Sequence, residues 1–254
     1  YLGKELVVNI SLIRFTNRVL EPLWNNKHIE NVQIIMDEDL GVGKRGAFYD
    51  RYGALKDVVQ NHALQLLALI AMEPPKSLSG DCIRDEKSKV LAKTRVADFL
   101  LGQYNGYRGE EKVRIDSDTE TFAALKLIVD NKRWTGVPFF IRSGKALEKK
   151  DTSIHIKFKE VKCLLSNCPV DTNYFTMVIQ PDEKFLLELN SKVPGKSLEI
   201  MPVKMNFNQS REHMVNTPEA YETLLFDAIE GDQSFFVRND EIEYAWEIID
   251  KIKK

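Results

Sequence analysis

The sequence predicts an α+β protein in which helices pack on one face of a large, mostly antiparallel β-sheet. Over much of the first 132 residues, apolar side chains recur at helical spacing, whereas five segments between residues 137 and 207 alternate apolar and polar side chains. Helical spacing returns near the end of the chain. Several alternating segments are apolar on one side and charged on the other, which is typical of an antiparallel sheet with one solvated or helix-covered face.

The first elements follow from the spacing of apolar residues. This spacing predicts a helix over residues 5–24, and a short apolar run predicts a strand at 30–36. The glycine-rich, charged stretch at 37–53 predicts a flexible loop.

Capping signals place several of the later helices. Asp57 and Gln60 have the spacing of a capping box, and so do Ser117 and Glu120, so each pair predicts a helix start. Pro218 predicts another, because proline is favoured at the first helical position. The remaining predicted helices cover residues 57–72, 83–100, 117–132, 217–229 and 240–254, and the remaining predicted strands cover 137–142, 153–159, 174–180, 185–189 and 198–207.

Composition excludes several classes of protein. The chain has 254 residues, of which 43% are hydrophobic, which is enough for a large core in one or two domains. Its net charge of −2 argues against a nucleic-acid-binding protein with a broad basic face. The apolar runs are too short to span a bilayer, so we expect neither nucleic acid nor membrane as a partner. No basic start with an apolar stretch and cleavage site is present, so we expect no secretory signal.

The cysteines predict neither a metal site nor a disulfide framework. Cys82, Cys163 and Cys168 are odd in number, form no paired C-x-x-C motifs and have no adjacent histidine. We therefore expect reduced thiols in a cytoplasmic protein.

One glycine motif resembles a dinucleotide-binding fingerprint. Gly41, Gly43 and Gly46 match G-x-G-x-x-G and follow a predicted strand. However, the acidic residues at 37–39 would repel a pyrophosphate, and no strand ends about 20 residues later, where the ribose ligand is expected. The motif therefore favours a loop over a dinucleotide site.

His62 is the candidate general base. Val58 and Val59 precede it by four and three residues and Leu66 follows by four, so the imidazole lies on the apolar face of its predicted helix. A histidine in this setting is either a hydrogen-bonded core residue or a base that faces a pocket, because imidazole titrates near neutrality. His155, on a predicted strand with charged neighbours, is interpreted as a solvated residue.

Two basic segments are candidates for anion binding. Residues 142–150 follow a strand, Gly144 allows close approach of a ligand, and Lys145 and Lys150 can supply charge to a phosphate, although a solvated turn explains the segment equally well. Lys4 lies at the start of the first helix, where it opposes the helix dipole unless an anion is bound there.

Together these segments resemble glucose-6-phosphate dehydrogenase. The chain opens with Tyr1-Leu2-Gly3-Lys4-Glu5, which lies inside the family's D-H-Y-L-G-K-E signature. Further matching stretches follow in the family's order over nearly the whole chain. They are FTNRVLEPLW at 15–24, DVVQNH at 57–62, AMEPP at 71–75, IRDEK at 83–87, LGQY at 101–104, RWTGVP at 133–138, RSGKAL at 142–147, IQP at 179–181 and EAYE at 219–222.

The resemblance implies a role for each candidate residue. His62 would take the proton from the C1 hydroxyl of glucose 6-phosphate while the C1 hydride passes to NADP, giving 6-phosphogluconolactone. Tyr1, Lys4 and Lys150 would bind the phosphate, and Lys4 would also lie near the reacting end of the sugar. The residues that would hydrogen-bond sugar hydroxyls are Glu38, Asp57 and Lys145, with Gln180 as a weaker neighbour; Asp57 has the alternative of only capping its helix.

The resemblance also implies that the chain is one part of a larger enzyme. Residues 1–254 match the family's C-terminal substrate-binding and dimerisation domain, truncated at both ends, without the N-terminal Rossmann domain. We therefore expect NADP to be bound mainly by the absent domain, with no cofactor or metal ligand in this chain. The family's large sheet predicts a homodimer or tetramer, and the isolated chain is expected to be inactive.

Two alternatives differ in function. A non-catalytic sugar-phosphate sensor or scaffold descended from this domain would have no need for His62 as a base beside Asp57. A hexose-6-phosphate enzyme of the endoplasmic reticulum would need a signal sequence. A cytoplasmic enzyme of the oxidative pentose phosphate pathway fits the resemblance best.

Overall fold

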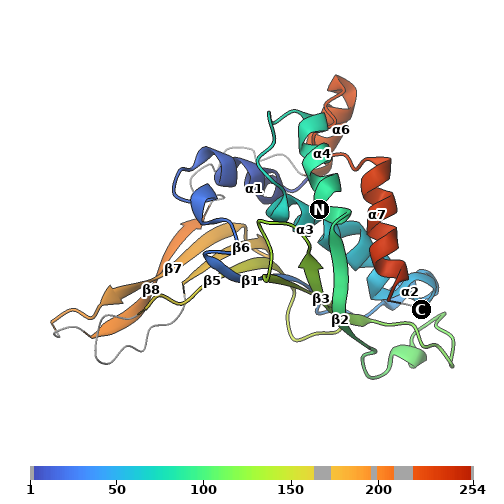
Figure 1. Cartoon of the computed structure of the whole chain (residues 1–254). Coiled ribbons are helices and arrows are strands. Elements are labelled where there is room, and N and C mark those ends of the chain that lie inside the picture. Colours follow the sequence, from blue (N-terminus) through green and yellow to red (C-terminus); the bar gives the residue numbers. More distant parts are fainter. Residues whose placement is uncertain (1–2, 163–172, 196–198, 209–219, 253–254) are drawn as a thin grey trace.

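The structure, a computed structural model, describes residues 3–162, 173–195, 199–208 and 220–252. Within these ranges, eight strands form one sheet in the order β2-β3-β4-β1-β5-β6-β7-β8. Figure 1 shows the helices gathered on one side of this sheet, as the sequence predicts. The strands are β1 Ile29–Asp37, β2 Thr94–Gly102, β3 Phe122–Val129, β4 Pro138–Gly144, β5 Asp151–Phe158, β6 Tyr174–Gln180, β7 Lys184–Lys192 and β8 Ile200–Asn208. The α-helices are α1 Glu5–Thr16, α2 Gly46–Ala54, α3 Leu64–Ala71, α4 Gly80–Leu91, α6 Ala220–Glu230 and α7 Asn239–Asp250.

The sheet is antiparallel except at its centre. β1 pairs in parallel with β4 and antiparallel with β5, and each of the other neighbouring pairs is antiparallel. The prediction of a mostly antiparallel sheet is therefore confirmed. In this register, Asp37 at the end of β1 lies opposite Gly144 at the end of β4 and Asp151 at the start of β5.

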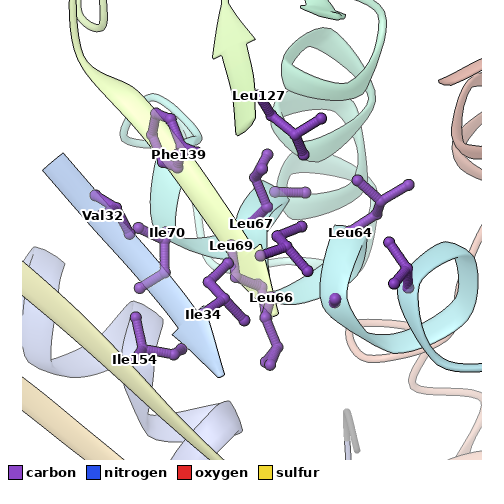
Figure 2. Packing of buried hydrophobic residues seen from close by; sticks show 14 of the residues in the cluster. Val32, Ile34, Leu64, Leu66, Leu67, Leu69, Ile70, Leu127, Phe139 and Ile154 are labelled. Carbon is purple, nitrogen blue, oxygen red and sulfur yellow. The ribbon is translucent and has the colours of Figure 1, made fainter. Parts of the chain in front are cut away.

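The core lies between the sheet and its helices. Every residue of α3 is buried, so this helix has no polar face and is enclosed on all sides. Figure 2 shows Leu66, Leu69 and Ile70 of this region beside Val32 and Ile34 of β1. The tight enclosure of α3 fixes the helical segment immediately before it, which carries His62.

Two predicted helices are wrong in whole or in part. The predicted helix at 83–100 is α4 followed by β2, and the predicted helix at 117–132 contains β3. In β3 every second residue, from Ala123 to Val129, is buried, so its true period is two. β2 and β3 pair as an antiparallel hairpin, and this tertiary pairing outweighs the local helical signals.

Both predicted capping boxes serve other purposes. Ser117 accepts a local hydrogen bond from the N–H of Thr119 but also donates one to buried Asp50, and no helix starts there. Glu120 accepts a hydrogen bond from the backbone N–H of Leu55, in a distant segment. Asp57 is not an N-cap, because it lies inside a continuous helical segment, the π-helix Leu55–Ala63. Its carboxylate instead accepts a hydrogen bond from Arg45 at 3.1 Å.

The glycine-rich stretch is not a flexible loop, because α2 occupies much of it. The first helix ends at Thr16 rather than at 24, since the backbone of Asn17 is extended and a separate 3₁₀ turn covers Glu21–Leu23.

The helix predicted at 217–229 corresponds to α6, while Thr217, Pro218, Cys163 and Cys168 lie outside the described residues. In the described part of the chain, no helix combines the length and apolar character that a membrane crossing needs.

Candidate functional site

A pocket of about 450 Å³ opens beside the sheet, and it collects predicted site residues from distant parts of the chain. Five of the eight predicted residues line it: Lys4, Glu38, His62, Lys150 and Gln180. The other lining residues are Gly3, Asp39, Leu40, Tyr221 and Leu224.

The sheet register explains why several of these residues meet. Glu38 follows β1 directly, Lys145 follows β4, and Lys150 precedes β5. The strand ends that carry them are neighbours, because Asp37 pairs with both Gly144 and Asp151. Gln180 joins them from β6, where it lies opposite Thr152 of β5. Three segments far apart in sequence therefore present polar side chains at one end of the sheet.

The start of α1 supplies positive charge at the same pocket. Lys4 is the N-cap residue of this 12-residue helix, and Gly3 and Lys4 both line the pocket. The backbone N–H groups of a first helical turn carry partial positive charge that attracts anions. With Lys150 on the other lining segment, the pocket has two ammonium groups and a helix terminus, which is the charge that a phosphate dianion requires.

His62 is held in its neutral form. It is partly buried at the end of the π-helix, and this burial is the largest of the causes that lower the pKa of its imidazole to about 4, because desolvation disfavours the charged form. The carboxylate of Asp57 acts in the opposite direction and raises that pKa. At neutral pH the imidazole therefore has a lone pair that can accept a proton from a bound ligand.

A polar cluster lies behind the pocket and includes the two predicted residues that do not line it. Lys145 is only 5% exposed, and its ammonium donates to Glu38 at 2.6 Å. The same ammonium lies 5.1 Å from the ring centroid of Tyr49, a cation–π contact. Burial, together with the carboxylates of Asp57 and Glu38, raises the pKa of Tyr49 above its ordinary value. Asp57 and Lys145 thus share one electrostatic environment with Glu38.

The structure therefore brings seven of the eight predicted residues into one pocket and its polar support. The eighth, Tyr1, lies outside the described residues. Their individual roles stay predictions. Tyr49 was missed, because nothing in its local sequence shows that its ring will be buried beside Lys145. Two further lining residues could have been predicted from the sequence. Asp39 follows the predicted site residue Glu38, and Tyr221 lies inside the matching stretch at 219–222.

Two of the three G-x-G-x-x-G glycines pack tightly against a neighbouring segment. A side chain at Gly46 would collide with the backbone oxygen of Glu111, and one at Gly41 would meet the side chains of Glu110 and Tyr104. Segment 104–111 therefore occupies the space beside Gly41 and Gly46, whereas the space beside Gly43 is open. The described ranges also contain no group of three or more His, Cys, Asp or Glu side chains that could hold a metal ion.

Comparisons with known proteins identify the family of this chain. Residues 11–254 match the family model described as glucose-6-phosphate dehydrogenase, C-terminal domain. The chain is 45% identical over 253 residues to the cytoplasmic glucose-6-phosphate 1-dehydrogenase 5 of Arabidopsis thaliana, covering 98% of this chain and 49% of the relative. It is 43% identical to the glucose-6-phosphate 1-dehydrogenase of Bacillus subtilis, covering 100% and 56%. The chain thus spans about half the length of these relatives.

Solved structures give the same result. A glucose-6-phosphate dehydrogenase in complex with glucose 6-phosphate superposes with a TM-score of 0.94 at 38% identity, covering 100% of this chain and 55% of that one. The enzyme from Mycobacterium avium superposes with a TM-score of 0.88 at 38% identity, covering 99% and 55%. The fold, the matched residues and the solved relatives agree, and the chain belongs to the family of glucose-6-phosphate dehydrogenase C-terminal domains.

Proposed function

We propose that this chain is the substrate-binding part of an NADP-dependent enzyme that oxidises glucose 6-phosphate to 6-phosphogluconolactone. The observation that carries the proposal is the shared pocket of His62, Lys4, Lys150 and Glu38. A neutral base, two cations and a carboxylate are the groups that a hexose monophosphate needs for binding and for proton removal.

In this mechanism the phosphate binds Lys4, Lys150 and the N-terminus of α1, and Tyr1 is a further proposed ligand. Charge attraction at this end fixes the sugar in one orientation, so that binding energy far from the reacting carbon positions it.

At the other end, Glu38 and Asp57 accept hydrogen bonds from sugar hydroxyls, while Lys145 and Gln180 help to orient them. His62 accepts the proton of the C1 hydroxyl, and its burial keeps it unprotonated before the substrate arrives.

NADP, as the hydride acceptor, is assigned to a part of the longer enzyme outside this chain. Segment 104–111 packs against Gly41 and Gly46 of the dinucleotide-type glycine motif, which argues against a pyrophosphate at these two positions. The chain alone is therefore proposed to bind sugar phosphate without oxidising it.

Isothermal titration of the isolated chain tests this assignment. Glucose 6-phosphate should bind, free glucose should bind much more weakly, and NADP should give no heat. Tight NADP binding, or equal affinity for glucose and glucose 6-phosphate, would contradict the proposed division of labour.

We further propose that the open face of the sheet joins copies of this chain into a homodimer or tetramer. A groove of about 490 Å³ runs over β1, β2, β3 and β4, and the apolar side chains of Leu100 and Phe140 are 61% and 37% exposed in it. Exposed apolar area of this kind on a sheet face favours association with another apolar surface. Sedimentation analysis of the chain should give a concentration-dependent dimer, and a strictly monomeric chain at high concentration would contradict the proposal.

We propose a cytoplasmic location, which agrees with the free thiol of Cys82 and with the names of two relatives from Arabidopsis thaliana. Other relatives, from tobacco and spinach, are named chloroplastic. Imaging of the full-length protein with a terminal tag would distinguish the two compartments.

A further inference from the structure

The helical segment that leads to His62 begins at a break that Glu120 occupies. At Gly53 the backbone has φ 68 and ψ −179, a conformation that ends α2. The next two backbone N–H groups both donate to Glu120. The N–H of Ala54 donates to the backbone oxygen of Glu120 at 2.9 Å, and the N–H of Leu55 donates to the Oε1 of the Glu120 carboxylate at 3.2 Å. Glu120 is only 4% exposed, so this contact is made away from water.

The break and the carboxylate fit each other closely. A side chain at Gly53 would collide with the carboxylate of Glu120, so the glycine makes room for it. A carboxylate at a helix start is also favoured by the partial positive charge of the free N–H groups. Residue 120 therefore caps a helix that starts 65 positions earlier in the chain.

The helix that starts at this cap is a π-helix rather than an α-helix. It covers Leu55–Ala63, and the N–H of Leu64 bonds to the carbonyl of Val59, five residues earlier. A π-helix takes more residues in each turn than an α-helix, and such segments are rare and frequently lie at functional sites.

The π-helical register has a direct consequence for the pocket. Asp57 and His62 are five residues apart, which in an α-helix would place them about 140° apart around the axis. With more residues per turn, the same two positions come closer to one face of the helix. In keeping with this register, the carboxylate of Asp57 acts to raise the pKa of the His62 imidazole, against the larger lowering by burial.

We propose that Glu120 is a positioning residue that holds the first turn of this helix and thereby fixes the π-helical register that presents His62 at the pocket and keeps Asp57 on the same side of the helix. The inference rests on the proposed function only in treating His62 as the base. Without the Glu120 carboxylate, the N–H of Leu55 loses its partner, and only the bond from Ala54 to the backbone oxygen of residue 120 still holds the first turn. The segment can then relax into the more stable α-helical register, in which Leu64 bonds to Gln60.

Crystal structures of variants of this chain test the register directly. In Glu120→Ala, we expect the N–H of Leu64 to bond to the Gln60 carbonyl and Asp57 to turn away from His62. Glu120→Gln keeps an oxygen that can accept from Leu55, so it should retain the bond from Leu64 to Val59. Asp118→Ala, which removes an exposed carboxylate two residues away, is the matched control and should also retain it.

Kinetics of the longer enzyme carrying the same variants separate positioning from simple stabilisation. Glu120→Ala should lower kcat about tenfold or more and change KM for the sugar phosphate less than threefold, because Lys4 and Lys150 come from other elements. Glu120→Gln should restore most of kcat.

The proposal is overturned if Glu120→Ala keeps the Leu64–Val59 bond, or if kcat is unchanged while only thermal stability falls. If Glu120→Ala does not fold, Glu120→Gln decides the matter, since a shift of its register to Gln60 would exclude the hydrogen bond as the determinant. The crystallographic result needs no substrate, so it stands or fails separately from the proposed reaction.

Discussion

The pocket and the open face of the sheet are built by the same strands, yet they present different chemistry. Along the strands, Phe140 and Leu100 help to give the groove on the open face a largely apolar lining, although Asp98, Lys126 and Arg142 also line it. Just beyond the strand ends, Glu38 and Lys145 leave the ladder and meet. In this sheet, the open face therefore favours association with another apolar surface, whereas the strand ends bring polar side chains from several segments close together.

Replacing His62 should have the largest effect on the pocket and none on the open face of the sheet. In the longer enzyme, His62→Asn should lower kcat by roughly 10²–10⁴-fold through loss of the general base, and leave association unchanged. Steady-state kinetics with sedimentation of the same sample measures both. Near-normal turnover would remove His62 from its proposed role.

Lys150→Ala should weaken binding at the phosphate end of the pocket. The KM for glucose 6-phosphate should rise about 10–100-fold, as expected for loss of one charge-assisted hydrogen bond, with little change for free glucose. Lys149→Ala is the matched control, because Lys149 is 72% exposed and pairs with Asp151. Equal losses for both sugars would argue against a phosphate contact.

The pocket also depends on how α2 packs, and Gly46 tests this. Gly46→Ala should reduce the free energy of unfolding by about 2 kcal/mol, because the new methyl group meets the backbone of Glu111. Gly109→Ala meets nothing within 4 Å and should change stability little. Urea denaturation measures both variants, and equal stability would show that segment 104–111 can move aside.

The buried state of His62 predicts how stability depends on pH. The folded pKa is about 4 and the unfolded value 6.5, so between these values the unfolded chain binds more protons. Stability should therefore fall as pH falls from 6.5 towards 4, by about 2 kcal/mol after allowance for partial exposure. His62→Asn should show a shallower fall in denaturation curves; identical curves would contradict the burial of a neutral imidazole.

The open face should respond to charge and leave the pocket intact. Phe140→Asp should weaken self-association about tenfold, since it places a carboxylate in the apolar groove. Arg95→Ala, at an exposed residue of β2 outside the groove, serves as the control. Sedimentation measures the effect, and loss of sugar-phosphate binding in Phe140→Asp would show that the two regions are not separate.

The candidate site could be predicted from the sequence further than the fold that holds it. The family resemblance named Lys4, Glu38, His62, Lys150 and Gln180, and all five line one pocket. Ser117 and Glu120 show the opposite case, because a capping-box spacing turned out to serve Asp50 and Leu55 in another element. Local spacing cannot reveal which distant N–H group a side chain will meet.

The sequence by itself determined the chemistry, namely a base, cations and carboxylates in stretches typical of one family, and the period-two strands from 137 onward. Only the tertiary structure decided that 94–102 and 122–129 are strands, that Tyr49 is buried beside Lys145, and that a π-helix carries His62. The physical reason is the distance along the chain between the residues that interact. Side-chain chemistry and periodicity are encoded locally, whereas strand pairing, burial and helical register depend on contacts between residues far apart in the chain.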